Sequence, residues 1–243
     1  CLYKKAVFCL PSISNKLEYL YQTKCMVEHA NIPFYIALNT NVFPHHKTLV
    51  DSLEYTQPSI IRISHKITSY ENYWQQDNLY DIDFAQSLGN CEIKEVYAKR
   101  TPKNLFIQLT LKNMCLCNLE LTITNQDQNT HNSNPLIEIY SNDTIYPIKP
   151  TTPHISFDPQ AQNKHLEEFI NLIKNSKQED QKIKQNISLN KKLELIAIQL
   201  ATKQSLKENK LIRVRNVLAS FQCDKKNLNP VNYLADYNSE ETS

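Results

Sequence analysis

Two short stretches decide the fold: LFIQLTL at residues 105–111 and LELTI at residues 119–123. In both, leucine or isoleucine occupies every second position, which is the period of a β-strand with one buried face. Only residues 112–118 separate the two stretches, so they predict an antiparallel pair. We therefore expect an antiparallel sheet at the centre of the fold.

The sheet is expected to continue beyond this pair. Ile137 and Ile139 predict a third strand, and Ile155 and Phe157 predict a short last one. Between them, residues 146–153 read YPIKPTTP, and such a run of prolines cannot belong to a central strand. The sequence thus predicts an antiparallel sheet of three to four strands over about residues 92–157.

Helices are expected to flank this sheet, which makes the predicted fold class α+β. Leu166, Phe169, Ile170 and Ile173 recur at the spacing of an amphipathic helix. We expect this helix to lie across the sheet with Phe169 in the core. Apolar residues at helical spacing continue over about residues 181–208 and 211–221, which predicts a helical C-terminal region.

The N-terminal part predicts a helix between Asn15 and Asn31, short strands at 34–38 and 61–67, and a helix that ends at Gly89 in a left-handed conformation. The expected organisation has four segments. These are an N-terminal α/β segment at 1–75, an α+β domain at 76–177, C-terminal helices at 178–235 and a disordered tail at 236–243.

Gly89 is the only glycine in 243 residues. Phosphate-binding loops, G-x-G-x-x-G dinucleotide turns and G-x-S-x-G nucleophile elbows each need several glycines in a short window. The sequence excludes these motifs, and for this reason favours a binding or scaffold protein over an enzyme.

Charge and cysteine content indicate which partners and which cellular compartment to expect. The 27 basic and 25 acidic residues give a net charge of +2, and no basic stripe indicates a nucleic-acid partner. No apolar run approaches the ~20 residues of a membrane-spanning helix. Seven cysteines form no disulfide framework, which is typical of reduced thiols in the cytoplasm or nucleus.

Several candidate metal ligands and acid–base groups also have ordinary structural explanations. Cys25 and His29 lie four apart on a predicted helix, and Cys9 and His45 could complete a zinc tetrahedron. A packed cysteine and a surface turn explain the same residues. The acid pairs Glu167-Glu168, Glu179-Asp180 and Asp81/Asp83 are interpreted as solvated charge. We therefore assign no catalytic, cofactor-binding or metal residues, and expect no cofactor.

One motif resembles a known family. Tyr146, Pro147 and Pro150 resemble the YPxxxP-type turn of the RWD domain, the non-catalytic relative of the ubiquitin-conjugating fold, although the second proline comes one position early. The expected order of elements over residues 76–177 is also similar. The resemblance implies a protein-interaction module. The competing fold, an immunoglobulin-like sandwich, would need strands in place of the helices after Pro159.

The sequence thus predicts a non-enzymatic interaction or scaffold subunit whose partners are other proteins, with no small-molecule substrate. The alternative is a lipid-anchored or secreted bacterial protein in which Cys1 is the mature N-terminus. A third hypothesis is a metalloenzyme that uses Cys25, His29 and His45.

Overall fold

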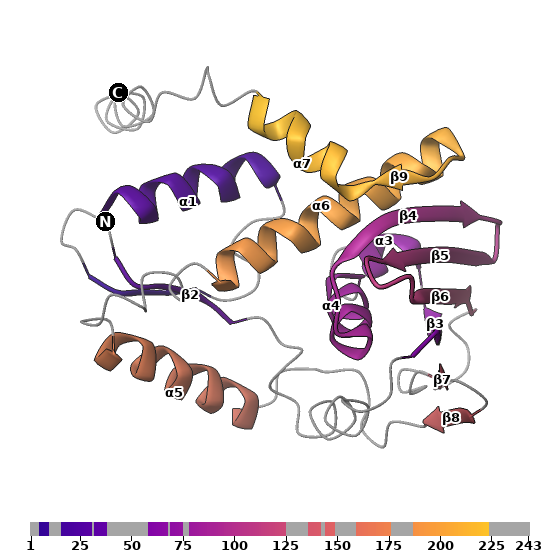
Figure 1. Ribbon diagram of the computed structural model, residues 1–243, viewed down its shortest axis with the longest axis horizontal. Helices are drawn as coiled ribbons and strands as arrows, with labels where there is room; N and C mark the ends of the chain where they lie inside the picture. The colour runs from indigo at the N-terminus through magenta and orange to yellow at the C-terminus, as the bar shows by residue number, and fades with distance from the viewer. Residues whose placement is uncertain are drawn as a thin grey trace.

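The computed structural model describes residues 5–9, 16–30, 32–37, 58–67, 69–74, 78–124, 136–141, 144–148, 159–175 and 187–223. Two parts are visible in Figure 1: a small N-terminal β–α–β unit and a larger sheet with helices on one side, with helix α6 reaching from one to the other. Within these ranges, every helix is too short or too polar to span a lipid bilayer.

In the described part of the chain, seven strands form one mixed sheet in the order β8-β7-β3-β6-β5-β4-β9. The predicted pair at its centre is confirmed, because Leu105 of β5 lies opposite Leu121 of β6 in an antiparallel ladder. The strands are β3 (Ile60–Ile67), β4 (Ile93–Arg100), β5 (Asn104–Leu111), β6 (Leu116–Ile123), β7 (Leu136–Ser141), β8 (Thr144–Ile148) and β9 (Ile212–Arg213).

Strand β3 occupies a position that local periodicity could not reveal. It comes from the segment that the sequence set apart as residues 1–75, yet it lies between β6 and β7. It runs parallel to β6, with Ile63 opposite Leu119, and antiparallel to β7, with Ile63 opposite Ile137. Both neighbours follow it by more than 40 residues in the chain, so only long-range packing places it there.

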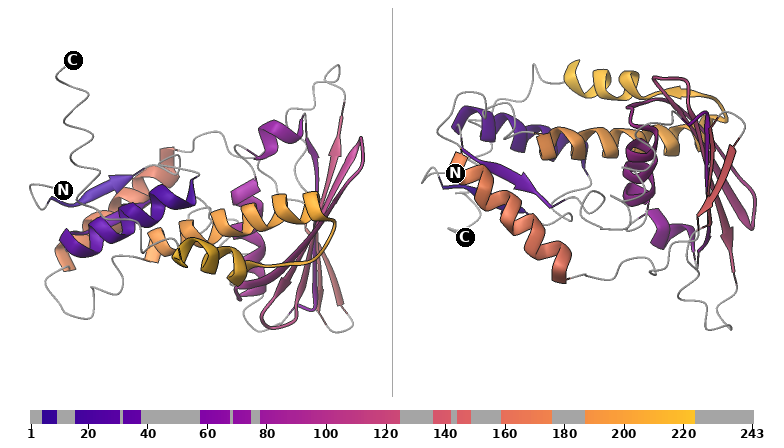
Figure 2. Two further views of the ribbon diagram at one scale, coloured as in Figure 1. Left: turned by 90° about the horizontal axis from the view of Figure 1, so that it is seen from above. Right: turned by 60° about the horizontal axis from the view of Figure 1, so that its bottom comes forward.

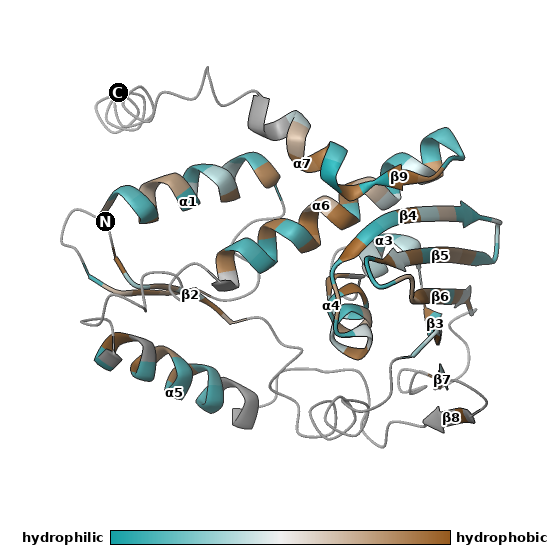
Figure 3. Ribbon diagram, in the orientation of Figure 1, coloured by the Kyte–Doolittle hydropathy of each residue, from teal (hydrophilic) through white to brown (hydrophobic). Residues whose placement is uncertain are grey.

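The helices cover one face of this sheet (Figure 2). They are α3 (Tyr70–Asn72), α4 (Asn78–Gly89), α6 (Ile187–Glu208) and α7 (Val214–Cys223). The covered face carries the alternating residues that the sequence indicated, and Ile107, Leu109 and Leu119 are fully buried there. Figure 3 shows hydrophobic residues on α4, α6 and the strands next to them. Apolar burial of this kind is the main favourable contribution to folding.

The N-terminal unit consists of β1 (Val7–Cys9), α1 (Leu17–Ala30) and β2 (Phe34–Ile36), with the two strands paired in parallel. Parallel strands need a crossover connection, and α1 supplies it. Leu20, Val27 and Ile36 are buried in the same hydrophobic core as the sheet. Helix α6 contacts α1, β2 and β4, so it joins the unit to the sheet.

The structure corrects two expectations about the sheet. It has seven strands in the described residues instead of three to four, and it is mixed instead of antiparallel. The RWD resemblance is also wrong at its motif, because Tyr146 and Pro147 lie within edge strand β8 instead of a turn. Proline has no backbone N–H to donate to a neighbouring strand, so an edge strand such as β8 can accommodate Pro147. Pro150 and the strand expected at Ile155 and Phe157 lie outside the described residues.

Helix α5 (Pro159–Asn175) forms where the apolar spacing predicted a helix, but its packing differs from the expectation. Phe169 is buried, yet its ring lies 5.4 Å from that of Phe8 on β1 and 6.3 Å from that of Tyr35 on β2. The helix therefore packs against the N-terminal unit and not across the sheet. Leu166 and Ile170 remain 46% and 40% exposed.

Gly89 ends α4 as predicted, but for a different reason. The left-handed residue is the next one, Asn90, with φ of 45°. A Cβ on Gly89 would lie 2.1 Å from Cδ2 of Leu111, a fully buried side chain. The glycine is thus required by the close approach of the helix end to β5.

We expect Gly89→Ala to lower the free energy of unfolding by about 1–3 kcal/mol, because the methyl group displaces Leu111 in a packed core. At a solvent-exposed position inside a helix, the same change would stabilise the protein by up to about 1 kcal/mol. Urea denaturation followed by circular dichroism measures the difference. Asn90→Gly is the matched control and should be neutral or stabilising, since glycine accepts φ of 45° without strain. A Gly89→Ala variant as stable as the native protein would contradict this account.

Candidate functional site

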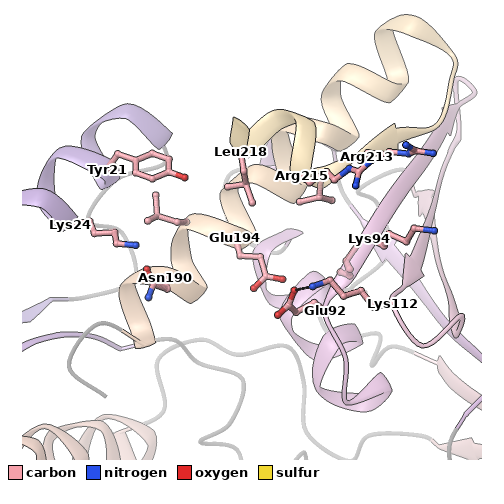
Figure 4. Close-up of a pocket in the computed structure, with 13 residues that line it drawn as sticks. Tyr21, Lys24, Glu92, Lys94, Lys112, Asn190, Glu194, Arg213, Arg215 and Leu218 are labelled. Atoms are coloured by element: carbon pink, nitrogen blue, oxygen red, sulfur yellow. Dashed lines mark hydrogen bonds and ion pairs between the residues drawn. The ribbon is translucent and has the colours of Figure 1, made fainter. Parts of the chain in front are cut away.

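A cavity of about 680 Å³ lies between α1, α6, α7 and the start of β4 (Figure 4). Its size is within the range of small-molecule sites. Charged and polar groups surround an apolar floor formed by Ile93, Leu193, Val214 and Leu218. The polar lining consists of Tyr21, Lys24, Glu92, Lys94, Lys112, Asn190, Glu194, Arg213 and Arg215.

Several of these side chains form ion pairs. Lys112, at the β5–β6 hairpin, pairs with Glu92, which precedes β4. Nε of Arg213 donates to Oε1 of Glu95 at 3.2 Å. Surface pairs of this kind contribute little to stability, and they place opposite charges side by side at the cavity wall.

Glu194 connects the cavity to a buried polar chain between α6 and α4. Nε2 of Gln86 donates to Oε1 of Glu194 at 2.6 Å, and Nζ of Lys191 donates to Oε1 of Gln86 at 2.5 Å. Lys191 Nζ also lies 3.0 Å from Oδ1 of Asp83. The chain thus runs from the cavity wall to a carboxylate that is 4% exposed.

Burial shifts the pKa values of the charged residues in and next to this polar chain. It raises the pKa of Asp83, and the ammonium group of Lys191 opposes that rise. Burial likewise raises the pKa of Glu194, again against Lys191. The neighbouring Lys192 is 2% exposed, and burial lowers its pKa to about 8. Lys191 is therefore the cation on which the charged forms of both carboxylates depend.

A second buried pair lies under α4. Nε2 of His65, on the covered face of β3, is 3.0 Å from Oδ1 of Asp81, and both side chains are buried. The pair attaches the helix to the sheet through a polar contact inside an apolar core. A buried polar group needs such a partner to avoid a desolvation cost.

A third polar cluster fastens α5 to the N-terminal unit. The hydroxyl of Tyr35 donates to Oε2 of Glu168 at 2.5 Å and lies 2.8 Å from Nδ1 of His165. The single hydroxyl proton is committed to Glu168, so Nδ1 of His165 must carry the proton that Tyr35 accepts. Among the described residues, Nε2 of the 3% exposed His165 has no hydrogen-bond partner.

The structure places the described residues of the predicted zinc alternative on two different elements. Cys25 and His29 lie on the exposed side of α1, Cys9 is half-buried on β1, and His45 lies outside the described residues. Within the ranges given above, no group of three or more His, Cys, Asp or Glu side chains could hold a metal ion. Cys115 and Cys117 are buried thiols beside the β5–β6 hairpin.

The interpretation of Asp81 and Asp83 as solvated charge was wrong, since both are buried and paired. A signal was present in the sequence. The stretch YDIDFA at residues 80–85 places both acids among apolar neighbours, and His65 stands at an inward position of the alternating strand 61–67. Acids and a histidine at core positions predict buried partners. The identity of those partners, and the cavity itself, required the fold.

No protein-family model matches this chain, and no curated protein sequence matches it. Solved structures do. A probable dehydrogenase from Thermotoga maritima is 17% identical with a TM-score of 0.66, and the match covers 88% of this chain and 74% of that one. A putative myo-inositol dehydrogenase from Sinorhizobium meliloti is 15% identical with a TM-score of 0.67, covering 86% and 74%.

A third similar structure is a scyllo-inositol dehydrogenase from Lactobacillus casei with bound NAD(H) and scyllo-inositol. It is 16% identical with a TM-score of 0.62, and the match covers 86% of this chain and 73% of that one. At these identities the matches establish a shared fold. This chain therefore has the fold of sugar and inositol dehydrogenases, and not that of an RWD domain.

These matches overturn the prediction of a non-enzymatic scaffold subunit. That prediction took the missing glycine motifs as evidence against enzymes as a class. The motifs concern only how a nucleotide phosphate is held, whereas the fold as a whole is one that dehydrogenases use.

The polar chain gives a pH-dependent prediction. Lys191→Met should lower the free energy of unfolding by about 1–3 kcal/mol at neutral pH, because it leaves the buried Asp83 without its cation. The loss of Lys191 raises the pKa of Asp83 further, so the deficit should shrink as the pH falls and Asp83 becomes protonated. Denaturant titrations at several pH values measure this. The control Lys207→Met, on the exposed end of the same helix, should leave the free energy of unfolding unchanged. If the loss of stability in Lys191→Met did not depend on pH, the argument would be refuted.

Docking of α5 should also depend on pH. Burial lowers the pKa of His165, with Glu168 opposing and Lys164 reinforcing the shift, so the docked helix favours the neutral ring. The undocked ring binds a proton at about pH 6.5, and docking should therefore weaken as the pH falls from 7 through that value. Hydrogen exchange of the α5 amides should accelerate accordingly. His165→Gln should abolish the acceleration, and its persistence in that variant would exclude His165 as the cause.

Proposed function

We propose that this chain binds a polyhydroxylated small molecule, a polyol or sugar, as a substrate of an oxidoreductase. The observation that carries the proposal is the cavity between α1, α6 and β4 in a chain with the fold of inositol dehydrogenases. One of the similar structures holds scyllo-inositol, a polyol, and another is an aldose-aldose oxidoreductase from Caulobacter crescentus.

The lining of the cavity suits such a ligand. Each hydroxyl group of a polyol both donates and accepts a hydrogen bond. Glu92 and Glu194 supply acceptors, Lys112 supplies donors, and Asn190 supplies both. The apolar floor formed by Leu193 and Val214 can contact the C–H faces of a ring. A few convergent polar groups above an apolar surface are typical of small-molecule sites.

The sequence does not carry the glycine-rich turn that usually holds a nicotinamide dinucleotide. The connection between β1 and α1, residues 10–16, reads LPSISNK and contains no glycine. The one glycine of the chain, Gly89, faces the side chain of Leu111, which fills the space next to it. We therefore derive no step through that cofactor, and confine the proposal to substrate binding and to the class of reaction.

Isothermal titration with myo-inositol, scyllo-inositol and an aldose tests the proposal. We expect saturable binding of at least one of them, and about tenfold weaker binding for Asn190→Leu, since a lost hydrogen bond is worth about 1 kcal/mol or more. Lys207→Met lies outside the cavity and should leave the affinity unchanged. The bound compound is then assayed for oxidation with added NAD⁺ or NADP⁺. Absence of binding by every compound, or binding that Asn190→Leu does not affect, would refute the site.

A further inference from the structure

We propose that the ligand of the cavity between α1, α6, α7 and β4 is a polyol that also carries an anionic group, a carboxylate or a phosphate ester. The inference rests on the proposed function, because it adds a charge to the ligand class named there. It is carried by a surplus of basic side chains on one side of the cavity.

The cavity is more basic than the protein as a whole. Across the chain, 27 basic residues are nearly balanced by 25 acidic ones. Of the described residues that line the cavity, five are basic and two are acidic. The basic residues are Lys24, Lys94, Lys112, Arg213 and Arg215, and the acidic ones are Glu92 and Glu194. The surplus of positive charge therefore belongs to this cavity and does not reflect a generally basic chain.

Two of the basic residues each have a carboxylate of their own. Lys112 pairs with Glu92 across the cavity wall. Nζ of Lys24 lies 3.8 Å from Oε1 of Glu28, one turn further along α1. Each of these two pairs has no net charge, so neither contributes to the surplus.

Within the described ranges, one carboxylate accompanies the other three basic residues. This carboxylate belongs to Glu95 on β4, and its Oε1 lies 3.2 Å from Nε of Arg213 and 3.7 Å from Nζ of Lys94. In the part of the chain that the structure describes, no carboxylate lies within ion-pair distance of Arg215. The surplus therefore lies on the side of the cavity formed by β4, β9 and α7 (Figure 4).

Helix α7 adds to the positive potential on this side. It begins at Val214, and its first turn contains Arg215 but no acidic residue. The N-terminal end of a helix carries partial positive charge, so an acidic residue is favourable there and a basic one is not. An anion bound beside Arg213 and Arg215 would offset this repulsion.

The chemistry of these side chains favours anionic oxygens over hydroxyl groups. A guanidinium group can donate two parallel hydrogen bonds to a carboxylate or a phosphate. A hydroxyl group offers one uncharged oxygen, so a neutral polyol would leave the surplus charge to solvent. Asn190 and Glu194, on α6, remain available for the hydroxyl groups of the same ligand. The cavity thus has one part for hydroxyl groups and another for an anionic group.

Isothermal titration at low ionic strength with glucose, glucuronate and glucose 6-phosphate tests the inference, because these compounds share one ring and differ only at carbon 6. A second comparison uses myo-inositol and its 1-phosphate. We expect at least one charged compound to bind at least tenfold more tightly than its neutral counterpart, since hydrogen bonds between charged groups are the stronger ones. Raising the salt concentration to about 1 M should reduce this difference, because salt screens exposed charges.

Arg215→Gln should weaken binding of the charged compounds about tenfold, with a smaller effect on the neutral ones. Arg215 is exposed, so the substitution leaves the hydrophobic core intact. Lys207→Gln is the matched control, because it removes a cation from α6 outside the cavity and should leave every affinity unchanged.

The outcomes distinguish this inference from the proposed function. Equal affinities for charged and neutral compounds would overturn the inference and leave the polyol site intact, whereas absence of binding by every compound would overturn both. A preference for charged compounds that Arg215→Gln does not reduce would also overturn the inference, because the anionic group would then bind elsewhere. Tighter binding of glucuronate identifies a carboxylate as the anionic group, and tighter binding of the phosphorylated compounds identifies a phosphate ester.

Discussion

Helix α6 has almost no solvent-facing side along its central turns, and this burial determines how the two parts of the molecule meet. Residues from Leu189 to Ser205 include buried positions on every side, among them Leu193, Ile196 and Thr202. A helix of 22 residues is about 33 Å long. It therefore passes from the β1–α1–β2 unit, along α4, to β4 at the edge of the sheet. A helix that is buried on nearly every side has no single amphipathic stripe, because protein contacts most of its surface.

The charged side chains of such a buried helix also need polar partners. Lys191 and Glu194 share partners on α4, so two helices that cover the same sheet are joined by hydrogen bonds as well as by apolar contacts. A buried polar chain is favourable in one geometry only, because any sliding of α6 against α4 leaves Asp83 unpaired. The same chain ends at the cavity wall, where Glu194 is held in a defined position. The contact between α6 and α4 therefore also determines the position of Glu194 in the candidate site.

The sequence predicted the elements that depend on neighbouring residues, but it did not predict contacts between distant segments. The alternation in β5 and β6 predicted their pairing, and the apolar spacing around Phe169 predicted α5, because both signals arise from neighbouring residues. The insertion of β3 between β6 and β7 depends on contacts between residues more than 50 positions apart, as for Ile63 and Leu119. No periodicity encodes such a contact. The cavity combines α1, α6, α7 and β4 for the same reason, so its lining could not be assembled from motifs.

The position of β3 has a consequence for how the chain is made. During synthesis β3 emerges before both of its partners, whereas β4, β5 and β6 follow one another and can pair as they appear. Its stretch IIRISHKI, residues 60–67, is rich in β-branched residues and must wait with both edges unpaired until β6 and β7 exist. An unpaired strand edge is a template for pairing with other chains, and the charges of Arg62 and Lys66 oppose such pairing. We therefore expect β3 to be most open to pairing with other chains before β6 and β7 have been made.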